Sequence, residues 1–138
     1  KKAHVLHNIQ DFQAGFQTIL GERGVNLSGG QKQRISIARA LLRKPELLIL
    51  DDCLSAVDTE TEEIILDELQ KEAATRATII VSHRISSIRN ATNIIVLDQG
   101  RIVESGTHEA LLSQKGAYSD MYQFQLEQEK DAQTKKED

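Results

Sequence analysis

Apolar positions along this chain follow two periods, and each period predicts a different kind of element. Five stretches place apolar residues three and four positions apart, the spacing of an amphipathic helix: residues 3–12, 31–44, 59–72, 108–115 and 117–126. Four short runs are apolar and β-branched, which predicts strands: residues 47–50, 78–82, 93–97 and 102–104. The last two strands flank a turn and should form a hairpin. An α/β fold follows.

Finer placements also follow from the pattern. Residues 47–50 are apolar at every position, which predicts a strand covered on both faces of a parallel sheet. The helix at residues 59–72 should turn Ile64 and Ile65 inward and its acidic residues to solvent. His108 falls in the exposed first turn of a helix that Thr107 caps, and we assign it no function.

The start of the helix near residue 29 carries the first candidate chemistry. Ser28 is placed to cap this helix, and Gly29 and Gly30 let another group approach the backbone closely. Uncovered N–H groups and the positive end of the helix dipole make such a start an anion site. Pro45 ends the helix, because the residue before proline is pushed out of the α region. Taken alone, Ser-Gly-Gly fits an ordinary serine cap better than a ligand site.

Three further candidates are ionisable residues next to predicted strands or on a helix face. Asp51 ends a strand, where α/β folds bind ligands and where a carboxylate suits a hard cation such as Mg²⁺. His83 follows another strand, and a lone histidine there is more often structural. His4 and His7 share a helical face, but no third metal ligand lies nearby in the sequence, so we do not expect a metal site there.

Composition limits the class of protein. The 138 residues are 39% hydrophobic, which supports one modest core and one domain, and the net charge of -4 argues against a nucleic-acid surface. The single cysteine, Cys53, excludes an internal disulfide and is compatible with a reducing compartment. We interpret it as a small buried residue rather than a reactive thiol. No run is long and apolar enough for a membrane span. The first residue, Lys1, suggests a fragment.

Four motifs in order resemble those of ABC-type ATPases. Residues 27–34 with the Ala-Arg-Ala-Leu at 38–41 resemble the signature motif, residues 47–52 the Walker B strand, residues 54–58 the D-loop, and His83 the switch histidine. The resemblance extends from about residue 3 to residue 126. It implies the C-terminal part of a P-loop NTPase fold of the multidrug or lipid exporter type, with a mostly parallel sheet and flanking helices.

The resemblance also implies roles for individual residues. The signature residues that would bind nucleotide in trans are Ser28, Gly29, Gly30 and Gln31. Asp51 would hold Mg²⁺ through water, and His83 would contact the γ-phosphate. Ser55 and Asp58 would lie at the dimer interface, and Glu22 would belong to a coupling loop that touches the membrane helices.

Asp52 departs from the family pattern, because the family normally has glutamate as the general base at this position. The aspartate carboxylate is drawn back by about one C–C bond, roughly 1.5 Å. A misplacement of about 1 Å can cost on the order of 100-fold in rate. We therefore expect slow hydrolysis at this chain's own site, and a heterodimer with one strong and one weak ATP site.

A P-loop is missing from the chain. The motif G-x-x-x-x-G-K-[ST] requires a glycine followed by lysine, and no glycine here is followed by one. The chain alone is therefore expected to be inactive. In the family the P-loop strand lies between the strand that leads to His83 and the strand at residues 93–97. Without it, two sheet edges are unpaired and self-association is expected.

The expected organisation has three parts: residues 1–26, the end of a helical subdomain with the exporter-type loop; residues 27–126, the signature and Walker B half of the ATPase core; and residues 127–138, a disordered charged tail. The expected cofactors are ATP and Mg²⁺. The expected partners are a second ABC ATPase subunit and transmembrane domains at the cytoplasmic face of a membrane, without nucleic acid. Two alternatives stay open: an ABC ATPase of DNA repair or chromosome maintenance, and a non-catalytic module that caps a partner ATPase.

Overall fold

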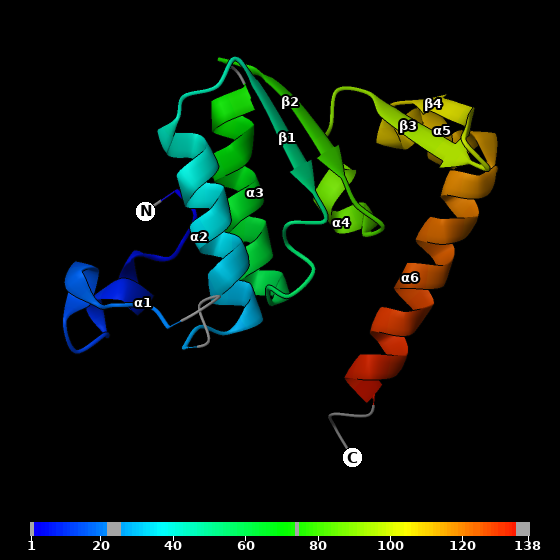
Figure 1. Cartoon of the computed structure of the whole chain (residues 1–138). Coiled ribbons are helices and arrows are strands. Elements are labelled where there is room, and N and C mark those ends of the chain that lie inside the picture. Colours follow the sequence, from blue (N-terminus) through cyan, green and yellow to red (C-terminus); the bar gives the residue numbers. More distant parts are fainter. Residues whose placement is uncertain (1, 22–25, 74, 135–138) are drawn as a thin grey trace. The chain divides into compact units, whose positions relative to one another are not determined.

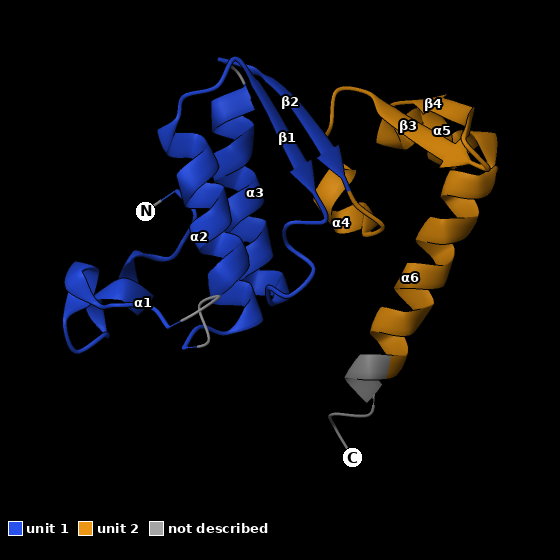
Figure 2. Ribbon diagram, viewed as in Figure 1, with its two compact units in different colours: residues 1–81 blue, residues 82–138 orange. Residues whose placement is uncertain are grey.

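The computed structural model describes residues 2–21, 26–73 and 75–134, with side chains as far as Asp131. Figure 1 labels the elements in chain order: α1 (Leu6–Gln10), the 3-10 helix η1 (Gly15–Gln17), α2 (Gly29–Leu42), β1 (Leu47–Asp51), α3 (Thr59–Ala73), β2 (Ala77–Val81), α4 (Ile85–Ile88), β3 (Ile94–Asp98), β4 (Arg101–Gly106), α5 (His108–Gln114) and α6 (Ala117–Thr134). They fall into two compact units, Lys1–Val81 and Ser82–Asp138 (Figure 2).

The first unit is built on a parallel strand pair. β1 and β2 pair from Leu47 opposite Ala77 to Asp51 opposite Val81. Apolar side chains of α2, α3 and one face of β1 form its core: Ile37, Leu41, Leu48, Leu50, Ile65 and Leu69. Burial of these side chains, which follow the predicted helical and strand periods, is the main force that holds the unit together.

The opposite face of this strand pair is exposed. Along β1 burial alternates, so Leu48 and Leu50 are buried whereas Leu47 is 48% and Ile49 is 59% exposed. The expectation of a strand covered on both faces is therefore wrong for this chain. An uninterrupted apolar run shows that both faces of the strand are hydrophobic. It does not show that other elements of this chain cover both faces.

The second unit contains the predicted hairpin. β3 and β4 pair antiparallel around the turn at Gln99 and Gly100, with an irregularity between Val96 and Leu97. Among the described residues the two sheets are separate, each with two strands. The core of this unit consists of Ile85, Ile94, Leu111 and Tyr118. The predicted cap is confirmed, because Thr107 accepts a hydrogen bond from the Ala110 N–H at 3.3 Å.

Three other expectations about helices differ from the structure. The first predicted helix is limited to Leu6–Gln10. In α3 the acidic residues do not all face solvent: Glu62 is 1% exposed, whereas Ile64, expected inside, is 40% exposed. A helix period fixes the spacing along one face but leaves its rotation free by a residue, and tertiary packing decides which residue turns inward.

The C-terminal expectation is also wrong in part. The sequence predicts disorder from Glu127, but α6 continues to Thr134. Its residues after Leu126 are Glu, Gln, Lys, Asp, Ala and Thr, most of them good helix formers, with no proline or glycine to stop propagation. The polar composition leaves this part of α6 without an apolar face, but its residues still have a high helix propensity.

Candidate functional site

The start of α2 is a capped helix N-terminus with its first residues at the surface. Ser28 Oγ accepts a hydrogen bond from the Gln31 N–H at 3.2 Å, and Gln31 Oε1 accepts one from the Ser28 N–H at 2.9 Å. This reciprocal pair is a capping box, so the predicted role of Ser28 as helix cap is confirmed. Ser28 and Gly29 are exposed. The helix dipole adds positive potential at this exposed end, where an anion could be bound.

The loop at residues 52–58 lies directly against this helix start. A Cβ on Gly30 would meet the Ala56 carbonyl oxygen at 2.7 Å, and one on Gly29 would meet Ala56 Cβ at 3.3 Å. The sequence predicts that these glycines admit a close neighbour. For Gly30 that neighbour is backbone of the same chain, so any side chain would push the two segments apart.

Gln33 joins the same two segments by hydrogen bonds. Its Nε2 donates to Ser55 Oγ at 2.9 Å and to the Asp52 carbonyl oxygen at 3.4 Å, and its Oε1 accepts from the Ala56 N–H at 2.9 Å. Sequence reasoning assigned no role to Gln33. The sequence offers no local signal for this role, because the partners of Gln33 lie 19 to 23 residues away and become adjacent only through the fold.

Asp51 and Asp52 lie at the carboxyl end of β1, and both are exposed. The Asp52 N–H donates to the Val81 carbonyl oxygen at 2.9 Å, which continues the parallel ladder past the strand. Asp52 itself has a φ of 43°, in the left-handed region that only a few per cent of non-glycine residues adopt. The chain therefore turns sharply at Asp52, and Ser55 Oγ donates to its carbonyl oxygen at 3.0 Å.

The two predicted interface residues have partners within the chain. Ser55 is bound to Gln33 and Asp52 as described. Asp58 Oδ1 accepts a hydrogen bond from the Thr61 N–H at 2.9 Å, at the start of α3. The hydrogen bonds from Thr61 hold the pKa of the Asp58 carboxyl below its usual value. Asp58 therefore caps α3 in this structure, and its proposed interface role remains a prediction.

His83 belongs to the second unit, whereas the other candidates belong to the first. It is exposed and follows β2 in the chain. Its carbonyl oxygen accepts a hydrogen bond from Gln125 Nε2 at 2.7 Å. The structure thus brings together the signature residues, Asp52 and Ser55 within the first unit, and His83 belongs to the second unit. Glu22 lies outside the described residues.

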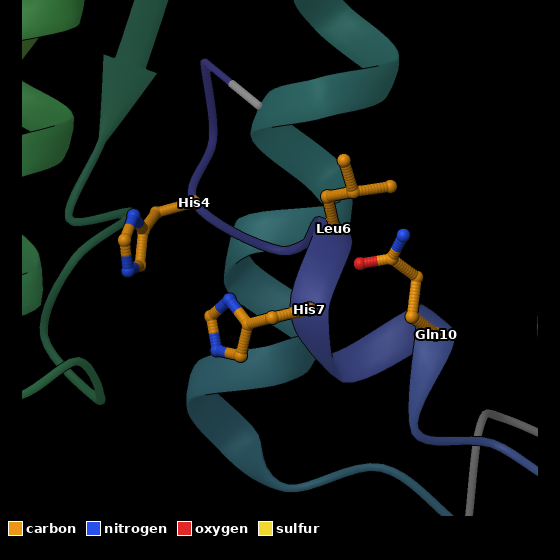
Figure 3. A pocket seen from close by; sticks show the side chains of 4 residues that line it. All are labelled: His4, Leu6, His7 and Gln10. Carbon is orange, nitrogen blue, oxygen red and sulfur yellow. The ribbon is translucent and has the colours of Figure 1, made fainter.

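The remaining histidines have structural neighbours. His4 and His7 line a pocket with Leu6 and Gln10, and their ring centroids lie 5.0 Å apart (Figure 3). Among the described residues no group of three His, Cys, Asp or Glu side chains could hold a metal ion. His108 is half-buried rather than exposed, and its Nδ1 lies 2.8 Å from the Tyr118 hydroxyl. The rings of Tyr118 and Tyr122 lie edge-on to the His108 imidazole and partly cover it, so the expected exposure of His108 is wrong.

Cys53 is half-buried next to the two aspartates. Burial raises the pKa of its thiol, and the nearby carboxylates of Asp52, Glu62 and Asp51 raise it further, against one backbone hydrogen bond that lowers it. A raised pKa disfavours the nucleophilic thiolate. The interpretation of Cys53 as a packing residue is therefore supported.

Fold and site together define a class of protein. A parallel strand ends in two carboxylates, and a capped, glycine-containing helix start lies against the loop that follows them. This arrangement resembles that of α/β ATP-binding proteins, whose ligands lie at the carboxyl ends of parallel strands and at helix starts. None of the described helices has the length and apolarity of a transmembrane segment.

Comparisons with known proteins agree with this class. Residues 1–55 match the ABC transporter family. The chain is 51% identical over 129 residues to the ATP-dependent lipid A-core flippase of Haemophilus influenzae, covering 91% of this chain and 22% of that protein. It is 46% identical to multidrug resistance protein 4 of Entamoeba histolytica, covering 100% of this chain and 11% of that protein.

A solved structure agrees in fold as well as in sequence. The structure of a bacterial Atm1-family ABC exporter with ATP bound matches with a TM-score of 0.86 and 44% identity, over 91% of this chain and 22% of that one. The chain belongs to the ABC transporter family, as part of an exporter-type ATP-binding domain. It spans between about a tenth and about a fifth of the length of these relatives.

Proposed function

We propose that this chain is the signature and Walker B half of the ATP-binding domain of an ABC exporter, which couples ATP binding and hydrolysis to transport of a substrate across a membrane. The observation that carries the proposal is the exposed, capped start of α2 against the loop that follows Asp51 and Asp52. The similarity to a lipid flippase and to a multidrug resistance protein supports the exporter type.

Each site residue has a role in this proposal. Ser28 and the N–H groups of Gly29 and Gly30, at the start of α2, bind the γ-phosphate of an ATP molecule that a second ATPase subunit holds on its P-loop, while Gln31 holds Ser28 in place through the capping box. Asp51 offers one exposed carboxylate, which fits Mg²⁺ held mainly by water and phosphate oxygens. The ion would neutralise phosphate charge during transfer. His83 contacts the γ-phosphate of the ATP at this chain's own site.

Asp52 makes the two sites of the dimer unequal. The helix start with Ser28 completes the partner's site, whereas Asp52 serves as the base at the chain's own site. Because aspartate is shorter than glutamate by one C–C bond, roughly 1.5 Å, its carboxylate holds the attacking water less well. We therefore propose a heterodimer, in which the partner subunit supplies the efficient base and this chain's own site binds ATP but hydrolyses it slowly.

Steady-state ATP turnover of the full-length parent with its partner tests the unequal sites. Ser28→Arg should abolish most of the turnover, because the large cation blocks the γ-phosphate position of the efficient site. Asp52→Glu should change turnover only modestly. Loss of all turnover in Asp52→Asn alone would show that Asp52 is the working base, and the proposal of unequal sites would fail.

The chain by itself should not hydrolyse ATP, because it carries no P-loop lysine to hold the phosphates. Phosphate release with Mg²⁺ and ATP should stay at background. Turnover that increases with chain concentration and disappears in Asp51→Asn would contradict this.

The remaining proposals concern the surroundings in the cell. The full-length protein would carry or bind transmembrane domains, and its ATPase part would lie at the cytoplasmic face of the membrane. Glu22 would contact the ends of the membrane helices there. Sequence upstream of Lys1 tests this directly: membrane spans would support the exporter, whereas a coiled coil or DNA-binding module would favour a DNA-repair ATPase.

A further inference from the structure

One side chain of the C-terminal helix spans the backbone on both sides of Arg84. Gln125 Nε2 donates to the His83 carbonyl oxygen at 2.7 Å, and Gln125 Oε1 accepts from the Ile85 N–H at 3.0 Å. Gln125 is half-buried in α6, 42 residues after His83. Both bonds lie within the second unit. A single amide thus satisfies one carbonyl and one N–H of this piece of backbone.

The segment that Gln125 binds lies between the end of β2 and the start of α4. β2 ends at Val81 and α4 begins at Ile85, so the backbone of residues 82–84 belongs to neither element. Ser82 Oγ accepts from the Arg84 N–H at 3.0 Å, which closes a tight local turn. Together with the two bonds from Gln125, this bond holds the backbone on both sides of Arg84.

Packing keeps Gln125 in place. Ile85 is 2% exposed and belongs to the same core as Tyr118 of α6, which is 1% exposed. The core fixes α6 against the start of α4, so the amide of Gln125 reaches the segment from a rigid support. One of the two bonds is made to the peptide group that follows His83 and the other to the peptide group that follows Arg84, so the backbone that carries the His83 side chain is held on its C-terminal side.

We propose that Gln125 is a positioning residue for His83, through which the C-terminal helix α6 sets the orientation of the histidine toward the γ-phosphate. This inference rests on the proposed function, in which His83 contacts that phosphate. Glutamine suits the position because its amide has an N–H group that donates to the carbonyl and an oxygen that accepts from the N–H. Glutamate has the same shape but cannot donate when ionised, and leucine can do neither.

Selectivity between ATP and ADP at this chain's own site is the quantity to measure, because only ATP has a γ-phosphate. In the full-length parent with its partner, azido-ATP photolabelling of the parent chain would be competed with ATP or ADP. Gln125→Leu should weaken competition by ATP about tenfold, which is the equivalent of one lost hydrogen bond between His83 and the γ-phosphate. Competition by ADP should stay within about twofold of its original value. In Gln125→Glu, competition by ATP should be weaker than in the unchanged protein but stronger than in Gln125→Leu.

A matched control separates positioning from general helix damage. Gln123 is exposed on the same helix, so Gln123→Leu should change neither ATP nor ADP competition. If Gln125→Leu weakened competition by ATP and by ADP to the same extent, the role of Gln125 would be merely structural and the inference would be overturned.

The double variant with His83→Ala completes the test. His83→Ala should itself weaken ATP competition, and Gln125→Leu should add nothing in that background, because the oriented group is gone. If His83→Ala weakens ATP competition and Gln125→Leu does not, the inference fails and the proposed function stands. If His83→Ala has no effect on ATP, the proposed role of His83 fails, and the inference with it.

Discussion

The side-chain oxygen of Gln33 accepts the backbone N–H of Ala56 at 2.9 Å, while the nitrogen of the same amide donates to Ser55 at 2.9 Å. The helix that starts at the signature and the loop that follows the Walker B strand are thereby joined by one side chain. In the proposed dimer these two segments serve different ATP sites. A displacement of one segment would therefore be transmitted to the other.

Replacement of Gln33 by leucine should loosen this junction. Leucine has a similar size, but the Ala56 N–H and the Ser55 hydroxyl lose their bonds to residue 33. Hydrogen bonds of this kind contribute about 0.5–1.5 kcal/mol each to the free energy of unfolding. We expect the free energy of unfolding, measured by urea titration, to fall by about this amount in Gln33→Leu. Lys32→Leu, on an exposed neighbouring position, is the control and should change it by less than about 0.5 kcal/mol. Equal effects of both substitutions would contradict the prediction.

The two signature glycines should respond differently to alanine. In Gly30→Ala the new Cβ would lie 2.7 Å from the Ala56 carbonyl oxygen, so the loop must move, at a cost of about 1–3 kcal/mol. In Gly29→Ala the nearest atom is a Cβ at 3.3 Å, and the better helix propensity of alanine offsets up to about 1 kcal/mol. Urea unfolding of the two variants should show a clear loss only for Gly30→Ala. A loss of the same size in both would mean that the Ala56 carbonyl does not decide the difference.

The thiol of Cys53 should react slowly. Burial and the nearby carboxylates raise its pKa, so at a given pH less thiolate is present than in an unfolded chain. Iodoacetamide labelling at pH 8 should therefore be slower in the folded chain than in urea, and its midpoint should lie at higher pH. Equal rates in both states at every pH would show that the folded environment does not protect the thiol.

Local sequence patterns predicted those parts of the structure that depend on local chemistry. The cap at Ser28 and the cap at Thr107 follow from side chains that bond to backbone two or three residues on, and the hairpin follows from a short turn. The signature and Walker B motifs were also recognisable, because phosphate binding requires particular residues at fixed spacing. These features need no knowledge of the tertiary structure.

The parts that could not be predicted depend on distant partners. Gln33 and Gln125 each bond to backbone that lies about 20 or 40 residues away, and nothing next to them in sequence indicates this. The exposed face of Ile49 could not be predicted either, because an apolar run does not say which elements cover it. Glu62 was assigned to solvent by its charge, yet packing of α3 buries it.

The exposed apolar faces of both sheets should make the isolated chain self-associate. On β1 and β2, Ile49 is 59%, Ile79 49% and Val81 51% exposed, and among the described strands each pairs with one neighbour only. Open edges and apolar faces favour pairing with another chain. Light scattering should show a molar mass that increases with concentration, and Ile49→Lys should reduce this increase.

Leu42→Lys is the control for that experiment, because Leu42 is 81% exposed but lies on a helix. It should leave the association unchanged. A single molar mass equal to that of the monomer across a wide concentration range would refute the prediction.

The capping bond of Ser28 also gives its hydroxyl a direction. A serine hydroxyl has one proton and two lone pairs, and one lone pair is engaged by the Gln31 N–H. The group that faces a ligand is then a donor, in line with the N–H groups of the first turn. An incoming oxygen anion meets hydrogen-bond donors there, whereas a cation would meet the positive end of the helix dipole. The helix start therefore favours anions over cations, independently of the size or shape of the ligand.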